Sequence, residues 1–68
     1  MAVNITLNGK ACAFEQPMNV LSLLETLKVP PGSVVVEHNR EILHRNKFDR
    51  VVLNDGDELE LIRFVGGG

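Results

Sequence analysis

The sequence has no tryptophan or tyrosine, a single cysteine and no surplus of positive charge. Seven Lys and Arg residues stand against nine Asp and Glu residues, so the formal net charge at pH 7 is −2. Such a chain cannot neutralise a phosphate backbone, and we expect no binding to nucleic acid. One cysteine cannot form an internal disulfide, which favours a reducing compartment.

Long apolar runs and an export signal are also missing. No run approaches the ~20 apolar residues of a membrane-spanning helix, and no basic segment followed by an apolar stretch marks secretion. We therefore expect a cytoplasmic protein with no membrane association. The 68 residues make one domain at most, and so short a chain can spare little core for an internal catalytic cavity. A self-contained enzyme is not expected.

Motifs for nucleotide and metal chemistry are absent too. Neither Gly-x-x-x-x-Gly-Lys nor Gly-x-Gly-x-x-Gly occurs. Cys12, His38 and His44 lack the spacing of metal ligands. We expect no metal site and no bound cofactor, and we interpret Cys12 as a small buried hydrophobic residue.

What is present begins with a hairpin signal. Apolar and polar residues alternate over residues 3–7, and Asn8-Gly9 favours a two-residue type I′ turn. Such a turn fixes the register of the return strand. The predicted pairs are Leu7 with Lys10, Ile5 with Cys12, and Val3 with Phe14.

A helix is predicted from Val20 to about Lys28. Asn19 is a good N-cap, and Pro30-Pro31-Gly32 ends the helical pattern. The spacing of apolar residues predicts a core-facing stripe made of Val20, Leu24 and Leu27.

Three further strands are predicted in the second half. They cover residues 34–36, 42–43 and 58–65, with turns at residues 39–41 and 54–57. Between them, a short helical turn is expected in residues 44–53, anchored by Phe48, Val51, Val52 and Leu53. In the last strand, Leu59 and Leu61 should face the helix, whereas alternation places Ile62 and Phe64 on the opposite face.

The order strand, strand, helix, strand, strand, strand predicts an α+β domain of the β-grasp type over residues 1–65. Its mixed sheet should have four to five strands, with the first hairpin and the last strand at the centre and one main helix across a face. Residues 66–68 are expected to form a flexible glycine tail.

The tail, Gly66-Gly67-Gly68, suggests a function. Three extended residues reach roughly 10 Å beyond a folded domain, and without Cβ atoms they can pass through a narrow slot into a partner's active site. The carboxylate of Gly68 is then the functional group. Because a carboxylate is a poor electrophile, it must be activated, and a partner must supply the ATP site.

Surface candidates lie beside the tail. Ile62, Phe64 and Val65 are predicted to form a partner-binding surface, because exposed apolar residues in a patch often mark an interface; alternatively, one of them closes the core. The acidic residues are interpreted as a solvated face or as a rim that meets a basic partner. They are Asp55, Asp57, Glu58 and Glu60.

These segments resemble the ThiS family, the sulfur carrier proteins of thiamine biosynthesis, and more broadly the prokaryotic ubiquitin-like carriers. The similarity is carried by Ile5-Thr6-Leu7-Asn8-Gly9, Val20-Leu21-Ser22-Leu23-Leu24, Val34-Val35-Val36-Glu37-His38-Asn39 and Asp55-Gly56-Asp57-Glu58-Leu59-Glu60-Leu61-Ile62-Arg63-Phe64-Val65-Gly66-Gly67-Gly68.

The resemblance implies a carrier rather than an enzyme. An E1-like adenylyltransferase (ThiF-like) would use ATP and Mg²⁺ to adenylate Gly68, and a cysteine-derived sulfur donor would convert the adenylate to a thiocarboxylate. Thiazole synthase (ThiG-like) would then take the sulfur. A monomer is expected when the chain is free. Alternatives on the same scaffold are a carrier for molybdopterin or tRNA thiolation, a ubiquitin-like modifier, and a β-grasp interaction module that carries nothing.

Overall fold

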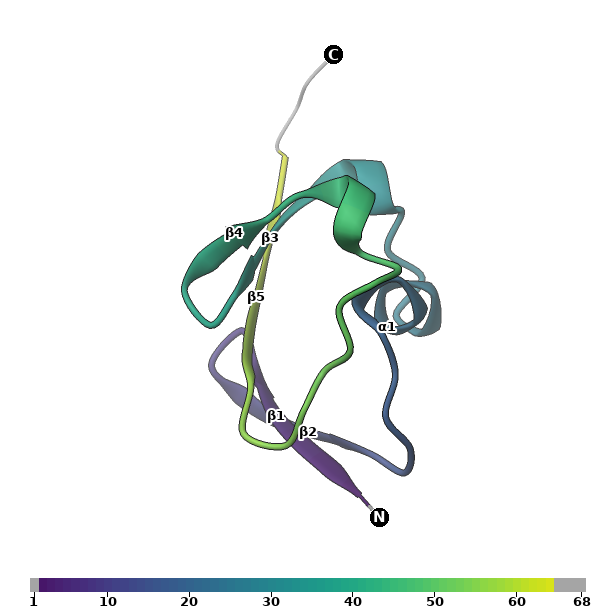
Figure 1. The fold of residues 1–68 in the computed structure, drawn as a ribbon. Helices are drawn as coiled ribbons and strands as arrows, with labels where there is room; N and C mark the ends of the chain where they lie inside the picture. Colours follow the sequence, from purple (N-terminus) through teal and green to yellow (C-terminus); the bar gives the residue numbers. More distant parts are fainter. Residues whose placement is uncertain (1, 65–68) are drawn as a thin grey trace.

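The computed structural model describes residues 2–64, which form a mixed sheet with one α-helix across one of its faces (Figure 1). Within these residues the order along the chain is β1 (Val3–Leu7), β2 (Lys10–Phe14), α1 (Val20–Thr26), a 3₁₀ helix (Pro31–Ser33), β3 (Val34–His38), β4 (Glu41–Leu43), a second 3₁₀ helix (Arg45–Lys47) and β5 (Glu58–Arg63). The predicted β-grasp architecture is confirmed. The expected boundary between residues 1–65 and the tail at 66–68 lies outside the described residues.

The sheet is ordered β2-β1-β5-β3-β4. β1 and β5 pair in parallel, and the other neighbouring strands pair antiparallel. β5 is therefore central, but of the first hairpin only β1 lies beside it, and β2 forms an edge. The prediction that the first hairpin and the last strand lie side by side is confirmed through β1, but the hairpin as a whole is not central, because no described strand pairs with the other side of β2. The start of β1 and the end of β5 lie at opposite ends of the molecule (Figure 1).

The first hairpin has the predicted register. Leu7 pairs with Lys10, Ile5 with Cys12 and Val3 with Phe14. The φ angles of Asn8 and Gly9 are 50° and 80°, as a type I′ turn requires.

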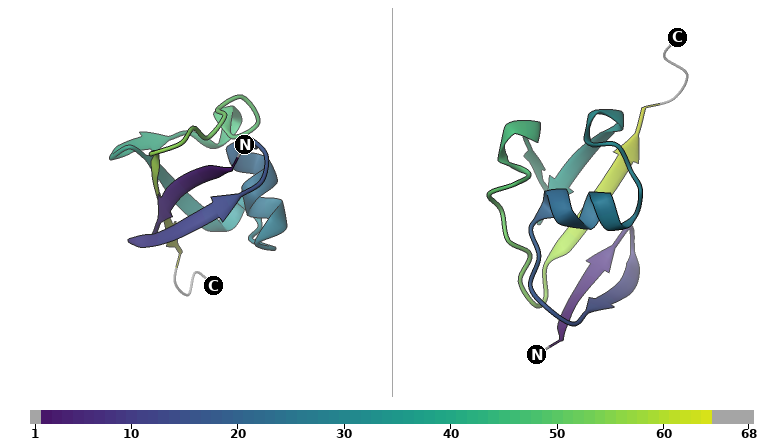
Figure 2. Two further views of the ribbon diagram at one scale, coloured as in Figure 1. Left: turned by 90° about the horizontal axis from the view of Figure 1, so that it is seen from below. Right: turned by 90° about the vertical axis from the view of Figure 1, so that its right-hand side faces the viewer.

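Helix α1 lies across the strands on one side of the sheet (Figure 2). Its N-cap is Asn19, whose Oδ1 accepts a hydrogen bond of 2.7 Å from the backbone N–H of Ser22. The helix ends at Thr26, before the predicted Lys28, which has a φ of 60°. Such a left-handed residue ends the helix and turns the chain back.

The predicted core stripe of the helix is right at two of its three positions. Val20 and Leu24 are fully buried, but Leu27 is 40% exposed. Leu27 lies beside an open groove that Leu7 and Leu61 also line, so no covering layer buries it. Leu23, 2% exposed, contributes to the core instead.

The connection between β4 and β5 closes the core beneath the helix. Phe48 follows the second 3₁₀ helix and is 2% exposed, and Leu53 is fully buried. Val52 is 48% exposed, so its prediction as an anchor was wrong. Val52 forms an isolated bridge with Asn19, and in extended chain neighbouring side chains point to opposite sides. Leu53 therefore faces inward and Val52 outward.

The inner face of β5 is as predicted. Leu59 is 2% exposed, and Leu61 is half-buried against the core. Cys12 is half-buried rather than buried, because it belongs to the edge strand β2.

Candidate functional site

The sequence predicts a site at the end of β5, and its residues fall into two groups. Ile62 lies in β5 and Phe64 follows it directly, both within the described residues. Val65 and the tail, Gly66 to Gly68, lie outside the described residues. The geometry of the site is therefore that of the sheet face leading to the tail.

An apolar surface lies on the face of the sheet opposite the helix, over the second half of β5 and the neighbouring parts of β3 and β4. We call it the outer apolar surface. Ile62 is 46% exposed, Phe64 63% and Ile42 64%. Ile62 pairs directly with the half-buried Val35 of β3, so their side chains are neighbours on one face. The members of this surface are Val35, Ile42, Ile62 and Phe64.

A hollow of about 240 Å³ joins part of this surface to the neighbouring loops. Val35, Ile42 and Phe64 line it together with Pro31 and Arg45. The three apolar side chains come from different elements, and β3 holds β4 and β5 on either side of it. The hollow could accommodate a hydrophobic side chain of a partner, and the guanidinium of Arg45 would lie beside it.

The same face becomes acidic towards the start of β5. Glu60 of β5 pairs directly with Glu37 of β3, which places two carboxylates opposite each other. Like charges in this position destabilise a sheet slightly. Glu58 lies nearby, and its Oε1 is 3.3 Å from Nε of Arg40. Glu37 also pairs with Ile42 of β4, so the two carboxylates directly adjoin the outer apolar surface.

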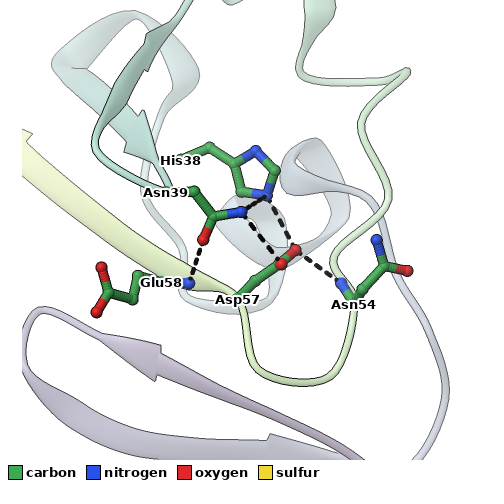
Figure 3. Close-up of polar contacts among 5 residues, drawn as sticks. All are labelled: His38, Asn39, Asn54, Asp57 and Glu58. Carbon is green, nitrogen blue, oxygen red and sulfur yellow. Dashed lines mark hydrogen bonds and ion pairs between the residues drawn. The ribbon is translucent and has the colours of Figure 1, made fainter.

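Two of the four predicted acidic candidates have structural roles instead. Asp55 accepts a 2.8 Å hydrogen bond from the backbone N–H of Asn4, which ties the turn before β5 to β1. Asp57 lies in a polar network on the other side of the strand (Figure 3). Of the predicted acidic rim, Asp55, Glu58 and Glu60 are exposed, but Asp55 is held by its bond to Asn4, which leaves Glu58 and Glu60 as the rim candidates.

The polar network around Asp57 was not predicted from the sequence (Figure 3). Oδ2 of Asp57 accepts hydrogen bonds of 2.9 Å from Nε2 of His38 and from the backbone N–H of Asn54. Its Oδ1 accepts from Nδ2 of Asn39 at 3.2 Å, and Oδ1 of Asn39 accepts from the backbone N–H of Glu58 at 2.9 Å. Partial burial raises the pKa of the Asp57 carboxyl, but these hydrogen bonds, first that from Asn54, outweigh it and lower the pKa below its ordinary value.

The role of the network is structural: it holds the beginning of β5 in place and takes part in no reaction. It joins the end of β3 to the turn that starts β5, so the strand leading to the candidate site starts from a fixed point. The sequence signal was the pair His38-Asn39 together with the Asn54–Asp57 turn, but contacts between residues 18 or 19 positions apart cannot be read from spacing.

Neither a cluster of metal ligands nor a membrane-spanning helix is found in the part of the chain that the structure describes. In residues 2–64, no three His, Cys, Asp or Glu side chains are grouped so that they could hold a metal ion. None of the helices there is long and apolar enough to cross a membrane.

The five-stranded mixed sheet with one helix, and the outer apolar surface beside its last strand, define a ubiquitin-like β-grasp protein. The ThiS family model matches residues 3–68. The sulfur carrier protein ThiS of Bacillus subtilis is 34% identical over 65 residues, covering 94% of this chain and 98% of that protein. The chain belongs to the ThiS family.

Other comparisons agree with the family and the fold. The crystal structure of the thiamine biosynthesis protein (ThiS) from Geobacter metallireducens matches with a TM-score of 0.83 and 42% identity, covering 97% of this chain and 100% of that chain. A thiazole synthase of Paramagnetospirillum magneticum is 39% identical over 66 residues, and one of Magnetococcus marinus is 35% identical. The chain spans about a fifth of the length of these two synthases.

Proposed function

We propose that this protein is a sulfur carrier of thiamine biosynthesis that carries sulfur as a thiocarboxylate on Gly68. The observation that carries the proposal is the ThiS family match, which extends through residue 68. The near-complete coverage of the Bacillus subtilis sulfur carrier protein supports it. In this proposal the chain is a monomeric co-substrate that partner enzymes modify, and it contributes no catalytic residues of its own.

The first step is activation of the tail. A carboxylate oxygen of Gly68 attacks the α-phosphorus of ATP, pyrophosphate leaves, and an acyl-adenylate forms. The chain has no nucleotide-binding motif, so an E1-like adenylyltransferase (ThiF-like) must supply the ATP and Mg²⁺ site. The adenylate makes the carbonyl carbon electrophilic, because AMP is a far better leaving group than oxide.

The second step loads sulfur. Cysteine-derived sulfur at the sulfide level attacks the Gly68 carbonyl carbon as hydrosulfide, the C–O bond to AMP breaks, AMP leaves, and loss of the sulfur-bound proton gives the thiocarboxylate. The third step is delivery of that sulfur to thiazole synthase (ThiG-like) for the thiazole ring. Two proteins named thiazole synthase contain a segment similar to this chain, which supports the pairing of carrier and synthase.

The outer apolar surface is the proposed docking face for these partners, and Val65, which follows Phe64 in the sequence, is proposed to contribute to the same contact. Phe64 and Ile42 expose more than half of their surface, and apolar residues gathered in this way favour an interface. The opposed Glu37 and Glu60 favour a partner with basic groups facing them, since these would relieve the repulsion between the carboxylates.

Two changes at the tail test the proposal. One variant lacks Gly68, and another carries an added alanine after it. We expect both to lose ATP-dependent pyrophosphate release with the adenylating enzyme by at least about 100-fold, because the carboxylate is displaced from its required position. Unchanged pyrophosphate release and sulfur loading in either variant would contradict the proposal. Unchanged urea denaturation curves would show that the domain itself is intact.

A further inference from the structure

Strand β5 has an open edge next to its last residues. Hydrogen bonds on its β1 side run from Thr6 N–H to the Asp57 carbonyl at 2.9 Å and from Asn8 N–H to the Leu59 carbonyl at 2.9 Å. The next bond on that side is from Leu61 N–H to Oδ1 of Asn8 at 2.7 Å. After Asn8 the chain turns away into β2, whereas β5 continues along β3 (Figure 1).

Strand geometry shows which backbone groups are left. Phe64 N–H donates to the Ser33 carbonyl at 3.1 Å, so Phe64 faces the β3 side. Because backbone groups alternate between the two edges of a strand, the Leu61 carbonyl and the N–H of Arg63 face the β1 side. Neither has a hydrogen-bond partner among residues 2–64.

An apolar groove lies alongside this edge. It has a volume of about 440 Å³ and is lined by the end of β1, the C-cap of the helix and the loop after it, the start of β3 and the end of β5. Leu27 is 40% exposed in it, and Arg63 brings a guanidinium that forms no ion pair with the described residues. The lining residues are Leu7, Asn8, Leu27, Val29, Val34, Leu61 and Arg63.

From this edge and groove we infer that an extended segment of the adenylating enzyme pairs with β5 at Leu61 and Arg63 and places apolar side chains in the groove. Strand addition of this kind supplies affinity through backbone hydrogen bonds and specificity through pockets for alternate side chains. A carboxylate on the segment would pair with Arg63. The inference rests on the proposed function, since it takes the adenylating enzyme as the partner.

Position along the chain favours this occupant. Arg63 precedes the proposed modified residue, Gly68, by only five positions. An enzyme that binds the tail in its active site must therefore have part of its surface close to this edge. A strand held against β5 would fix the direction in which the tail leaves the domain. The outer apolar surface is on the opposite face of the sheet, so the two surfaces would clamp β5 from different sides.

Amide hydrogen exchange at single residues tests the inference. In the free chain we expect the N–H of Arg63 to exchange at least about 100-fold faster than that of Phe64, which is bonded to Ser33. Adding the adenylating enzyme with ATP should slow exchange at Arg63 by about 100-fold or more. If exchange at Arg63 stays fast while the enzyme is bound, the inference is wrong. Slow exchange that depends on carrier concentration without enzyme would assign the edge to a second copy and also overturn it.

A pair of variants provides a second measurement. Leu27→Lys puts a charge into the groove, and Val52→Lys changes an aliphatic residue of similar exposure elsewhere. We expect L27K to raise the KM of the carrier in the adenylation reaction about 10-fold and V52K to leave it unchanged. Equal KM values for both variants would contradict the inference.

Sulfur loading, measured in parallel, separates the inference from the proposed function. Protection of Arg63 without sulfur on Gly68 would support the docking edge and contradict the carrier chemistry. Loading without protection would support the carrier chemistry and overturn the docking edge.

Discussion

Nε2 of His38 lies 2.9 Å from Oδ2 of Asp57, and this contact joins the last residue of β3 to the residue that precedes β5. Both side chains are mostly buried, with exposed fractions of 23% and 13%. The contact crosses 19 positions of sequence. It therefore fixes the start of the strand that leads to the candidate site.

The Asp57 network should make stability depend on pH at the acidic end. The pKa of Asp57 is lowered in the folded protein from an ordinary value of 3.8, so its stabilising effect is complete above that value and is lost as pH falls through the lowered pKa. Asp57→Asn should be less stable at pH 7. It should also lose less stability than the original protein between about pH 5 and pH 2. Urea denaturation across this range measures both, and equal losses would contradict the prediction.

The turn between β3 and β4 should respond oppositely to glycine at its two positions. Asn39 and Arg40 have φ angles of 52° and 71°, a region that costs L-residues about 1–2 kcal/mol. Arg40→Gly removes this strain and only an exposed ion pair with Glu58, so we expect a gain of up to about 1 kcal/mol. Asn39→Gly also removes hydrogen bonds to Asp57 and Glu58, so we expect a loss of about 1–2 kcal/mol. Urea denaturation of both variants checks the difference in sign.

The two leucines of the predicted helical stripe should differ in the same measurement. Leu24 is fully buried, and Leu24→Ala should lower the free energy of unfolding by about 2–5 kcal/mol. Leu27 is 40% exposed, so Leu27→Ala should cost less than about 1 kcal/mol. Similar losses in thermal or urea denaturation would mean that the groove beside Leu27 is filled.

Most of the fold could be predicted from local signals in the sequence. Alternation and the Asn8-Gly9 turn predicted the register of the first hairpin, because a two-residue turn leaves only one pairing. The N-cap at Asn19 was equally local. The exposure of Leu27 was not predictable, because it depends on which elements surround the end of the helix, where an open groove remains, rather than on helical period.

Local sequence signals also predicted only part of the candidate site. Alternation in the last strand correctly exposed Ile62 and Phe64, whereas the contribution of Ile42 required the pairing of β4 with β3. The role of Asp57 could not be read from the sequence, since four nearby acidic residues look alike until the fold brings His38 and Asn39 to one of them.

Phe64 should contribute to partner docking without contributing to stability. It is 63% exposed, so Phe64→Ser should change the free energy of unfolding by no more than about 0.5 kcal/mol. We expect its kcat/KM as a substrate of the adenylating enzyme to fall about 10-fold or more, as for an aromatic interface anchor. The matched control is Val52→Ser, because Val52 is also exposed but lies outside the outer apolar surface. Equal kcat/KM for the two variants would remove Phe64 from the docking face.

Intact mass spectrometry tests the carrier chemistry most directly. The protein is incubated with ATP, Mg²⁺, the E1-like enzyme and a cysteine-derived sulfur donor, and fragmentation then locates any change in mass. The account predicts a gain equal to the replacement of one oxygen by sulfur, confined to Gly68. An isopeptide product without sulfur, or an unmodified Gly68 under conditions that load an established ThiS protein, would contradict it.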